Sequence, residues 1–95
     1  MIVELMEFRL LPRVGVDEFL AADHRLQTEF AYVQSGLLRR TTARNDQGDW
    51  LVIDLWRTAG EADACAERWE HDQIAQSFMS LVDRSSVKVQ RFSTV

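Results

Sequence analysis

The chain has 95 residues, 46% of them hydrophobic, and it carries eleven basic against fifteen acidic side chains, a net charge of −4. This length predicts a single domain, residues 1–95, and the acidic balance disfavours nucleic acid as a partner because its phosphates would be repelled. The single cysteine, Cys65, excludes an internal disulfide, and we find no signal peptide and no apolar run of about 18 residues. These features predict a cytoplasmic location without membrane binding.

The first third of the chain predicts a strand followed by a helix. Ile2–Leu10 alternates between two faces, and the only proline, Pro12, breaks the pattern. From Val16–Val33 the apolar residues recur at steps of three and four, as in an amphipathic helix, and Gly36 follows its end. The expected core stripe of this helix is Phe19, Ala22, Leu26, Phe30 and Val33.

The middle of the chain predicts a β-hairpin. Leu37–Arg44 and Trp50–Arg57 read as strands, and the polar turn Asn45–Asp49 separates them by five residues. Only Asp54 interrupts the apolar run of the second arm. A strand that is apolar on both sides is expected to be covered on both faces.

The last third predicts helical segments and a final strand. Thr58 followed by Glu61 matches a capping box, and small apolar residues continue at helical spacing to Trp69. Asp72 can start a further helical segment, and Val87–Val95 alternates as a strand. The apolar stripe expected after Asp72 is Ile74, Phe78, Leu81 and Val82.

The element order β, α, β, β, α, β predicts an α+β fold of ferredoxin-like type, with a four-stranded antiparallel sheet and its helices on one face. The other face of this sheet would be open, and it would not be uniformly polar because the strand from Trp50 is apolar on both sides. A second copy of the chain is the simplest cover, so we expect a homodimer in which two sheets form an α/β barrel.

Several segments resemble those of the dimeric α/β-barrel superfamily, and within it the antibiotic biosynthesis monooxygenase (ABM) domains. The resemblance is carried by the first strand, by Gln34–Arg40, by Asp54–Arg57 at the hairpin's end and by Thr58–Trp69, and it spans essentially the whole chain. It implies a cleft between helices and sheet that could take an aromatic or polycyclic ligand. Some members of the family oxygenate such substrates without a cofactor.

The haem-degrading branch of this family implies an Asn in strand one, a Trp in helix two and a His nine residues later. Here these positions hold Met6, Trp69 and Phe78, so only the Trp matches and haem degradation is disfavoured. The first strand contains no Asn at all. This absence also counts against a cofactor-free oxygenase. With haem disfavoured, we predict no cofactor.

Asp54 is the leading candidate for catalysis because a carboxylate in an apolar strand needs a partner. Candidate partners are Arg40, Arg44, Arg9 and Arg91. Asp54 could form a salt bridge that fixes strand register or the dimer interface. Alternatively, it could be a general base with a shifted pKa.

His71, next to the predicted end of the second helix, could be an acid–base group or simply a surface histidine. Asp23 and Gln27 lie at the flank of the first helix's apolar stripe, where they could line the cleft or border it while hydrated. Further candidate ligand contacts are Arg40, Trp56, Trp69 and Phe78. The aromatic members of this set could instead be core or interface anchors.

Two histidines and one cysteine without close spacing do not make a metal site. The resemblance to the ABM domains, with the aromatic and polar candidates above, implies a protein that binds a small aromatic or polycyclic molecule in the cleft, as a cofactor-independent monooxygenase or related enzyme. The alternative is a non-enzymatic ligand-binding or accessory protein.

Overall fold

The alternating and helical patterns of the sequence form one antiparallel sheet and three short helices. A computed structural model describes residues 1–95. The elements are β1 (Ile2–Leu10), α1 (Val16–Glu29), a 3-10 helix (Ala31–Val33), β2 (Leu37–Arg44), β3 (Trp50–Trp56), α2 (Ala59–Trp69), α3 (Gln73–Met79) and β4 (Val82–Ser93). No helix is both long and apolar enough to cross a bilayer.

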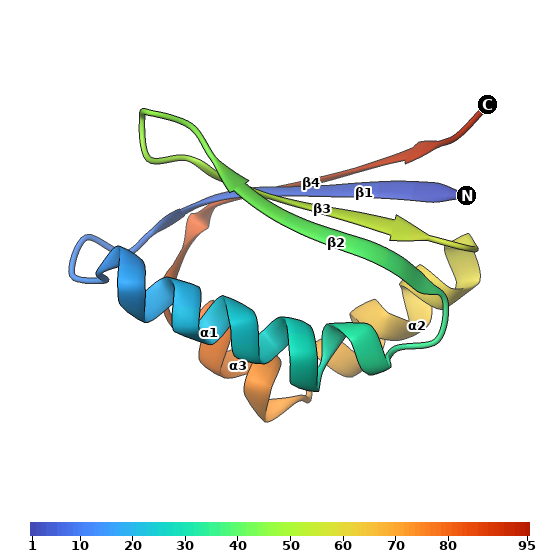
Figure 1. Ribbon diagram of the computed structural model, residues 1–95, viewed down its shortest axis with the longest axis horizontal. Helices are drawn as coiled ribbons and strands as arrows, with labels where there is room; N and C mark the ends of the chain where they lie inside the picture. The colour runs from blue at the N-terminus through green and yellow to red at the C-terminus, as the bar shows by residue number, and fades with distance from the viewer.

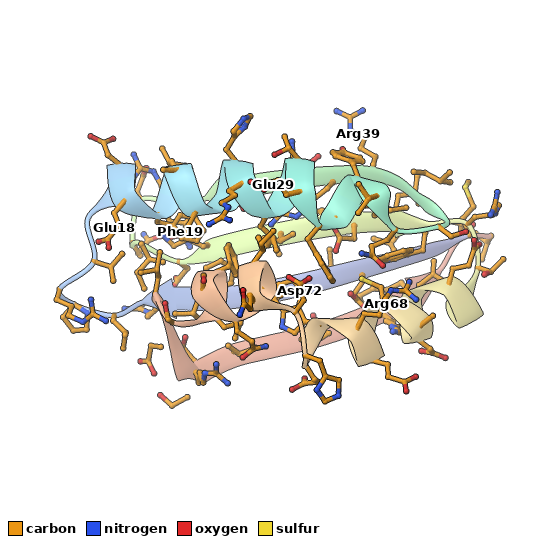
Figure 2. The ribbon with its side chains drawn as sticks, turned by 90° about the horizontal axis from the view of Figure 1, so that it is seen from below. Glu18, Phe19, Glu29, Arg39, Arg68 and Asp72 are labelled. Carbon is orange, nitrogen blue, oxygen red and sulfur yellow. The ribbon has the colours of Figure 1, made fainter.

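The strands pair in the order β2-β3-β1-β4, and all neighbours are antiparallel. All three helices lie on the same side of this sheet (Figure 1). Seen from the helix side, α1 overlies β2 and β3, whereas α2 and α3 overlie β1 and β4 (Figure 2). The predicted ferredoxin-like α+β fold is therefore confirmed.

Aromatic rings fill the space between helices and sheet at one end. Phe8, Phe19 and Phe78 are each at most 2% exposed, and their ring centroids lie 5.4–5.8 Å apart in tilted or edge-on pairs. Trp50 joins them, with its ring 4.5 Å from that of Phe19. Such pairs add about 0.5–1.5 kcal/mol each to the free energy gained by burying their area.

Two helix starts follow the predicted capping chemistry. The hydroxyl of Thr58 accepts a hydrogen bond from the backbone N–H of Glu61 at 3.2 Å, which confirms Thr58 as the N-cap. The Glu61 carboxylate accepts from the Thr58 hydroxyl at 3.0 Å, and not from the Thr58 backbone N–H as in a full capping box. The carboxylate of Asp72 likewise accepts from the backbone N–H of Ala75 at 2.9 Å and starts α3. The break between these helices gives α2 and α3 separate directions above the sheet.

Two predicted element ends are wrong. The first helix ends at Glu29 and gives way to the 3-10 helix, so Val33 is 69% exposed rather than in the core. The last strand begins at Val82 instead of the predicted Val87. It extends this far because Leu10, at the end of β1, pairs with Val82 in the sheet. Leu81 and Val82 are still buried, as predicted, but they do not belong to a helix.

The face of the sheet opposite the helices is bare (Figure 1). Because successive side chains of a strand alternate, the buried Trp50, Val52 and Trp56 face the helices, and the residues between them face away. This face carries Val3, Leu5, Leu51, Ile53, Leu55 and Phe92. It is thus apolar along β3, as the sequence predicts, and mixed on β1 and β4, where Glu7, Lys88 and Gln90 share it.

Candidate functional site

A cavity of about 370 Å³ lies between the sheet and the helices. Fourteen of its nineteen lining residues are hydrophobic. Residues from β1, β3, α2 and α3 form much of its wall, including Met6, Val52, Trp56, Cys65, Trp69 and Phe78. A mostly apolar hollow of this size with a few polar groups is what small-molecule sites look like.

The cavity exists because α2 places small side chains opposite the sheet. Ala62, Cys65 and Ala66 occupy the positions where larger residues would fill the core. At the end nearer the aromatic cluster, the ring of Trp69 packs edge-on against Phe30 and Phe78, with centroids 5.7 and 6.0 Å away. The alanine-rich helix therefore leaves space, and the row of three aromatic rings bounds it.

Arg40 and Asp54 bring charge into this apolar wall. The hairpin register places Arg40 directly opposite Asp54 on the helix-facing side of the sheet. The Arg40 Nε lies 4.0 Å from Asp54 Oδ1, an ionic contact that is too long for a hydrogen bond. Asp54 is therefore attracted by the guanidinium but is not held by it.

The guanidinium of Arg40 is held instead by α1. Its Nη2 donates to Asp23 Oδ1 at 2.7 Å, and its Nη1 donates to Gln27 Oε1 at 3.3 Å. The side chains of Arg40 and Asp23 are 3% and 11% exposed. This buried ion pair fixes the guanidinium beside Asp54 and connects α1 to the sheet.

The backbone of Arg40 is also fixed, by the phenol of Tyr32. The Tyr32 hydroxyl accepts from the Arg40 backbone N–H at 2.8 Å and donates to the Arg40 carbonyl at 3.3 Å. Because β2 is an edge strand, these two backbone groups have no strand partner on that side. Tyr32 therefore positions Arg40 from outside the sheet.

Burial raises the pKa of the Asp54 carboxyl from 3.8 to about 7. The guanidinium of Arg40 lowers it, whereas the carboxylates of Glu4 and Asp23 raise it further. Loss of hydration outweighs the single cation because Arg40 is already neutralised by Asp23. Near neutral pH the Asp54 carboxyl is therefore protonated in part of the molecules and ionised in the rest.

Two polar atoms at the cavity have no hydrogen-bond partner. They are Asp54 Oδ1 and the indole Nε1 of Trp56, and both are buried. The two residues are two positions apart on β3, so their side chains leave the same face of the strand. Buried polar groups without partners are rare, and each needs an explanation.

A second charged group crosses from the sheet to α2. Arg91 of β4 donates to Glu4 of β1 at 2.7 Å and to Asp63 of α2 at 2.5 Å. Glu4 and Arg91 line the cavity, and Asp63 does not. Sequence analysis missed Glu4, although it shares the alternating face of Met6 and Phe8 in β1.

The residues predicted as site candidates are only partly brought together. The cavity is lined by Asp54, Arg40, Trp56, Trp69 and Phe78. Asp23 and Gln27 do not line the cavity themselves. They accept hydrogen bonds from Arg40, which does line it. Their predicted direct contact with a ligand stays a prediction.

His71 lies outside this cavity, in the exposed turn after α2. It lines a separate, shallow hollow with Arg68 and Asp72. Figure 2 labels these two residues near the junction of α2 and α3. Only two of the seven residues around this hollow are hydrophobic. A catalytic role for His71 stays a prediction, and it would require a different site from that of Asp54.

Cys65 of α2 also lines the cavity. Its thiol is a poor nucleophile. Burial, together with the nearby carboxyl of Asp54, raises the pKa of its thiol to about 11. The thiol is therefore protonated at neutral pH. No group of three or more His, Cys, Asp or Glu side chains is arranged to hold a metal ion.

Comparison with solved structures shows that the fold of the whole chain is a known one. The crystal structure of an antibiotic biosynthesis monooxygenase matches 100% of this chain and 99% of its own, with a TM-score of 0.77 at 14% sequence identity. The chain has the fold of the ABM domains. No protein-family model and no curated protein matches the sequence.

Two further structures support the same fold assignment. SnoaB, a cofactor-independent oxygenase from Streptomyces nogalater, matches over 99% of this chain and 92% of its own, with a TM-score of 0.79 at 17% identity. A conserved protein from Methanosarcina mazei Go1 matches over 99% and 92%, with a TM-score of 0.75 at 12% identity. The resemblance to ABM domains is thus confirmed at the level of the fold of the single chain.

Proposed function

We propose that the protein is a cofactor-independent monooxygenase that acts on an aromatic substrate in the cavity, with Asp54 as the general base. The observation that carries this proposal is the carboxyl of Asp54, whose pKa is raised to about 7, in the wall of an apolar cavity. A base is most effective when its pKa lies near the working pH. The fold shared with SnoaB, a cofactor-independent oxygenase, supports the same chemistry.

The proposed reaction begins when the Asp54 carboxylate takes a proton from an electron-rich aromatic substrate. The substrate anion that forms can give electrons directly to dioxygen. If a ring CH₂ becomes a carbonyl, one oxygen atom enters the product, and the other leaves as water with the two hydrogens. The apolar wall of Trp69 and Phe78 would hold the rings and exclude bulk water.

An oxygen electrode with a panel of anthrones and quinols tests this function. We expect Asp54→Asn to lower kcat by about 10²-fold or more, because the amide cannot accept the proton. In the wild type, kcat/KM should rise with pH through about 7, as Asp54 loses its proton. Glu70→Gln is the matched control, since Glu70 also lines the cavity and the change is again from an acid to its amide. Equal activity of Asp54→Asn and the wild type would rule Asp54 out as the base.

Ligand binding without turnover is the alternative function. Asp54 and His71 are the two residues predicted to be catalytic, and only Asp54 lines the cavity. The separation of this pair supports the alternative. An aromatic compound that binds the wild type but causes no oxygen uptake across the panel would favour this alternative.

We also propose that the protein acts as a homodimer through the bare face of the sheet. The apolar side chains of this face, including Leu5, Ile53 and Phe92, support a second copy as its cover. Sedimentation should then give twice the 11.0 kDa of the chain. Ile53→Arg should give monomers, because it places a charge at the centre of this face, whereas the control His24→Arg on exposed α1 should not. A monomeric wild type would contradict the dimer.

A further inference from the structure

The indole N–H of Trp56 is the most unusual polar group of the cavity wall. The Trp56 side chain lines the cavity but is only 2% exposed, and its Nε1 atom is buried. No acceptor in the protein lies within hydrogen-bond distance of it. Leaving a buried donor without a partner destabilises the folded protein, so a donor of this kind is expected to have a use.

The other two tryptophans differ from Trp56 in this respect. Trp50 and Trp69 are not among the residues with a buried, unpartnered indole nitrogen. Trp50 packs in the aromatic cluster with Phe19, and Trp69 contacts the rings of Phe30 and Phe78. Their positions are explained by ring packing alone, whereas the position of the Trp56 N–H is not.

The neighbours of Trp56 indicate which atom would satisfy its N–H. Asp54, two residues earlier on the same face, holds the second unpartnered atom of the wall. Most of the remaining wall is hydrophobic, so a bound ring system would find few other polar groups there. A ligand oxygen is the acceptor that fits beside a carboxyl that is itself partly protonated.

We propose that Trp56 is a specificity-determining residue, whose indole N–H donates a hydrogen bond to an oxygen atom of the ring compound bound in the cavity. Together with Asp54 it selects oxygen-bearing rings over hydrocarbons of the same shape. This inference rests on the proposed use of the cavity as the ligand site, and it adds the group that recognises the ligand. When Asp54 takes a proton from the substrate, the same N–H faces the oxygen on which negative charge develops, and it stabilises that charge.

Two probes that differ by one carbonyl group test the inference: 1-tetralone and the hydrocarbon tetralin. We expect Trp56→Phe to weaken binding of 1-tetralone about tenfold, because the ligand oxygen loses its donor. Binding of tetralin should change by no more than about twofold, since the ring that contacts it remains aromatic. The control Trp69→Phe should weaken both probes by the same factor.

Nuclear magnetic resonance provides a readout that does not need the variant. In ¹⁵N-labelled wild-type protein, the Trp56 indole signal should move downfield with 1-tetralone and stay near its free position with tetralin. The signal is assigned by sequential experiments, so the test holds even if Trp56→Phe fails to fold. The inference would be overturned if Trp56→Phe weakened the binding of both probes equally. It would also be overturned if the Trp56 indole signal had the same position with 1-tetralone as with tetralin.

These measurements are separate from those of the proposed reaction. Neither probe has a phenol, and binding is measured without oxygen, so turnover plays no part. If oxygen uptake depends on Asp54 while the Trp56 signal stays unmoved, the inference falls and the proposed function stands. If neither probe binds at millimolar concentration, the cavity is not the ligand site, and the inference falls with it.

Discussion

Replacing Arg40 with methionine should lower the free energy of unfolding by about 3 kcal/mol at pH 8. The guanidinium is 3% exposed, and it is the partner of the buried carboxylate of Asp23 and the only cation in ionic contact with Asp54. Without it, the carboxylates of Asp23 and Asp54 lose the cation that compensates their charge. Removing one partner of a buried pair is costly for this reason, even where the intact pair adds little stability.

The loss in Arg40→Met should become smaller as the pH falls. At lower pH the Asp54 carboxyl, whose pKa lies near 7 in the wild type, takes up a proton, so one of the two unpaired charges is lost. Urea denaturation at pH 8 and pH 5 measures both effects. Arg25→Met is the matched control, because Arg25 pairs with Glu29 at 2.9 Å on the surface, with side chains 60% and 51% exposed.

The exposed pair of the control should contribute no more than about 0.5 kcal/mol at either pH. If Arg40→Met and Arg25→Met lose the same small amount of stability, Arg40 does not hold the buried network together. Activity of the folded Arg40→Met protein is informative too. Without the nearby cation, the pKa of Asp54 should rise further. The carboxylate that acts as the base would then form only at higher pH, so the activity should also appear at higher pH.

Much of this charged wall could be derived from the sequence. Asp54 is conspicuous because it interrupts an apolar strand, and the five-residue loop places Arg44 opposite Trp50. Counting back along both arms then brings Arg40 opposite Asp54. The choice of Arg40 among the four arginine candidates follows from strand register, which a hairpin of known loop length determines.

The partners of Arg40 outside the sheet could not be derived in this way. That Asp23 reaches it depends on how α1 crosses the sheet, and helix periodicity gives the face of a helix but not its crossing angle. Tyr32 reaches Arg40 because α1 ends at Glu29, earlier than its apolar pattern indicated. The cavity could not be predicted either. It depends on how much space the side chains beneath α2 leave unfilled, and the spacing of apolar residues in the sequence does not give that volume.

Asp54→Asn should be more stable than the wild type at pH 8, by about 2 kcal/mol, and equally stable at pH 4. The folded protein raises the pKa of this carboxyl from 3.8 to about 7. Below pH 4 the carboxyl is protonated in both folded and unfolded chains, so it resembles the amide. Between pH 4 and pH 7 the unfolded chain gives up the proton more readily, and the stability of the wild type falls as the pH rises.

The full shift corresponds to at most about 4 kcal/mol, at roughly 1.4 kcal/mol for each pKa unit. We expect about half of it, because the Asp54 side chain is 20% exposed and the ionised form keeps the attraction of Arg40. Urea denaturation from pH 4 to pH 8 measures the difference. Asp46→Asn, in the exposed hairpin loop, should show no such pH-dependent gain. A constant difference between Asp54→Asn and wild type would mean that the carboxyl ionises normally.

The stability and activity of Asp54→Asn are most informative together. A carboxyl that destabilises the fold at neutral pH has no structural reason to be there, since an amide or an apolar side chain would be tolerated better. If Asp54→Asn gains stability while oxygen uptake is lost, the charge at this position serves the chemistry of the cavity. If it gains stability and oxygen uptake is unchanged, the raised pKa is a consequence of burial alone, and the base must be sought elsewhere in the wall.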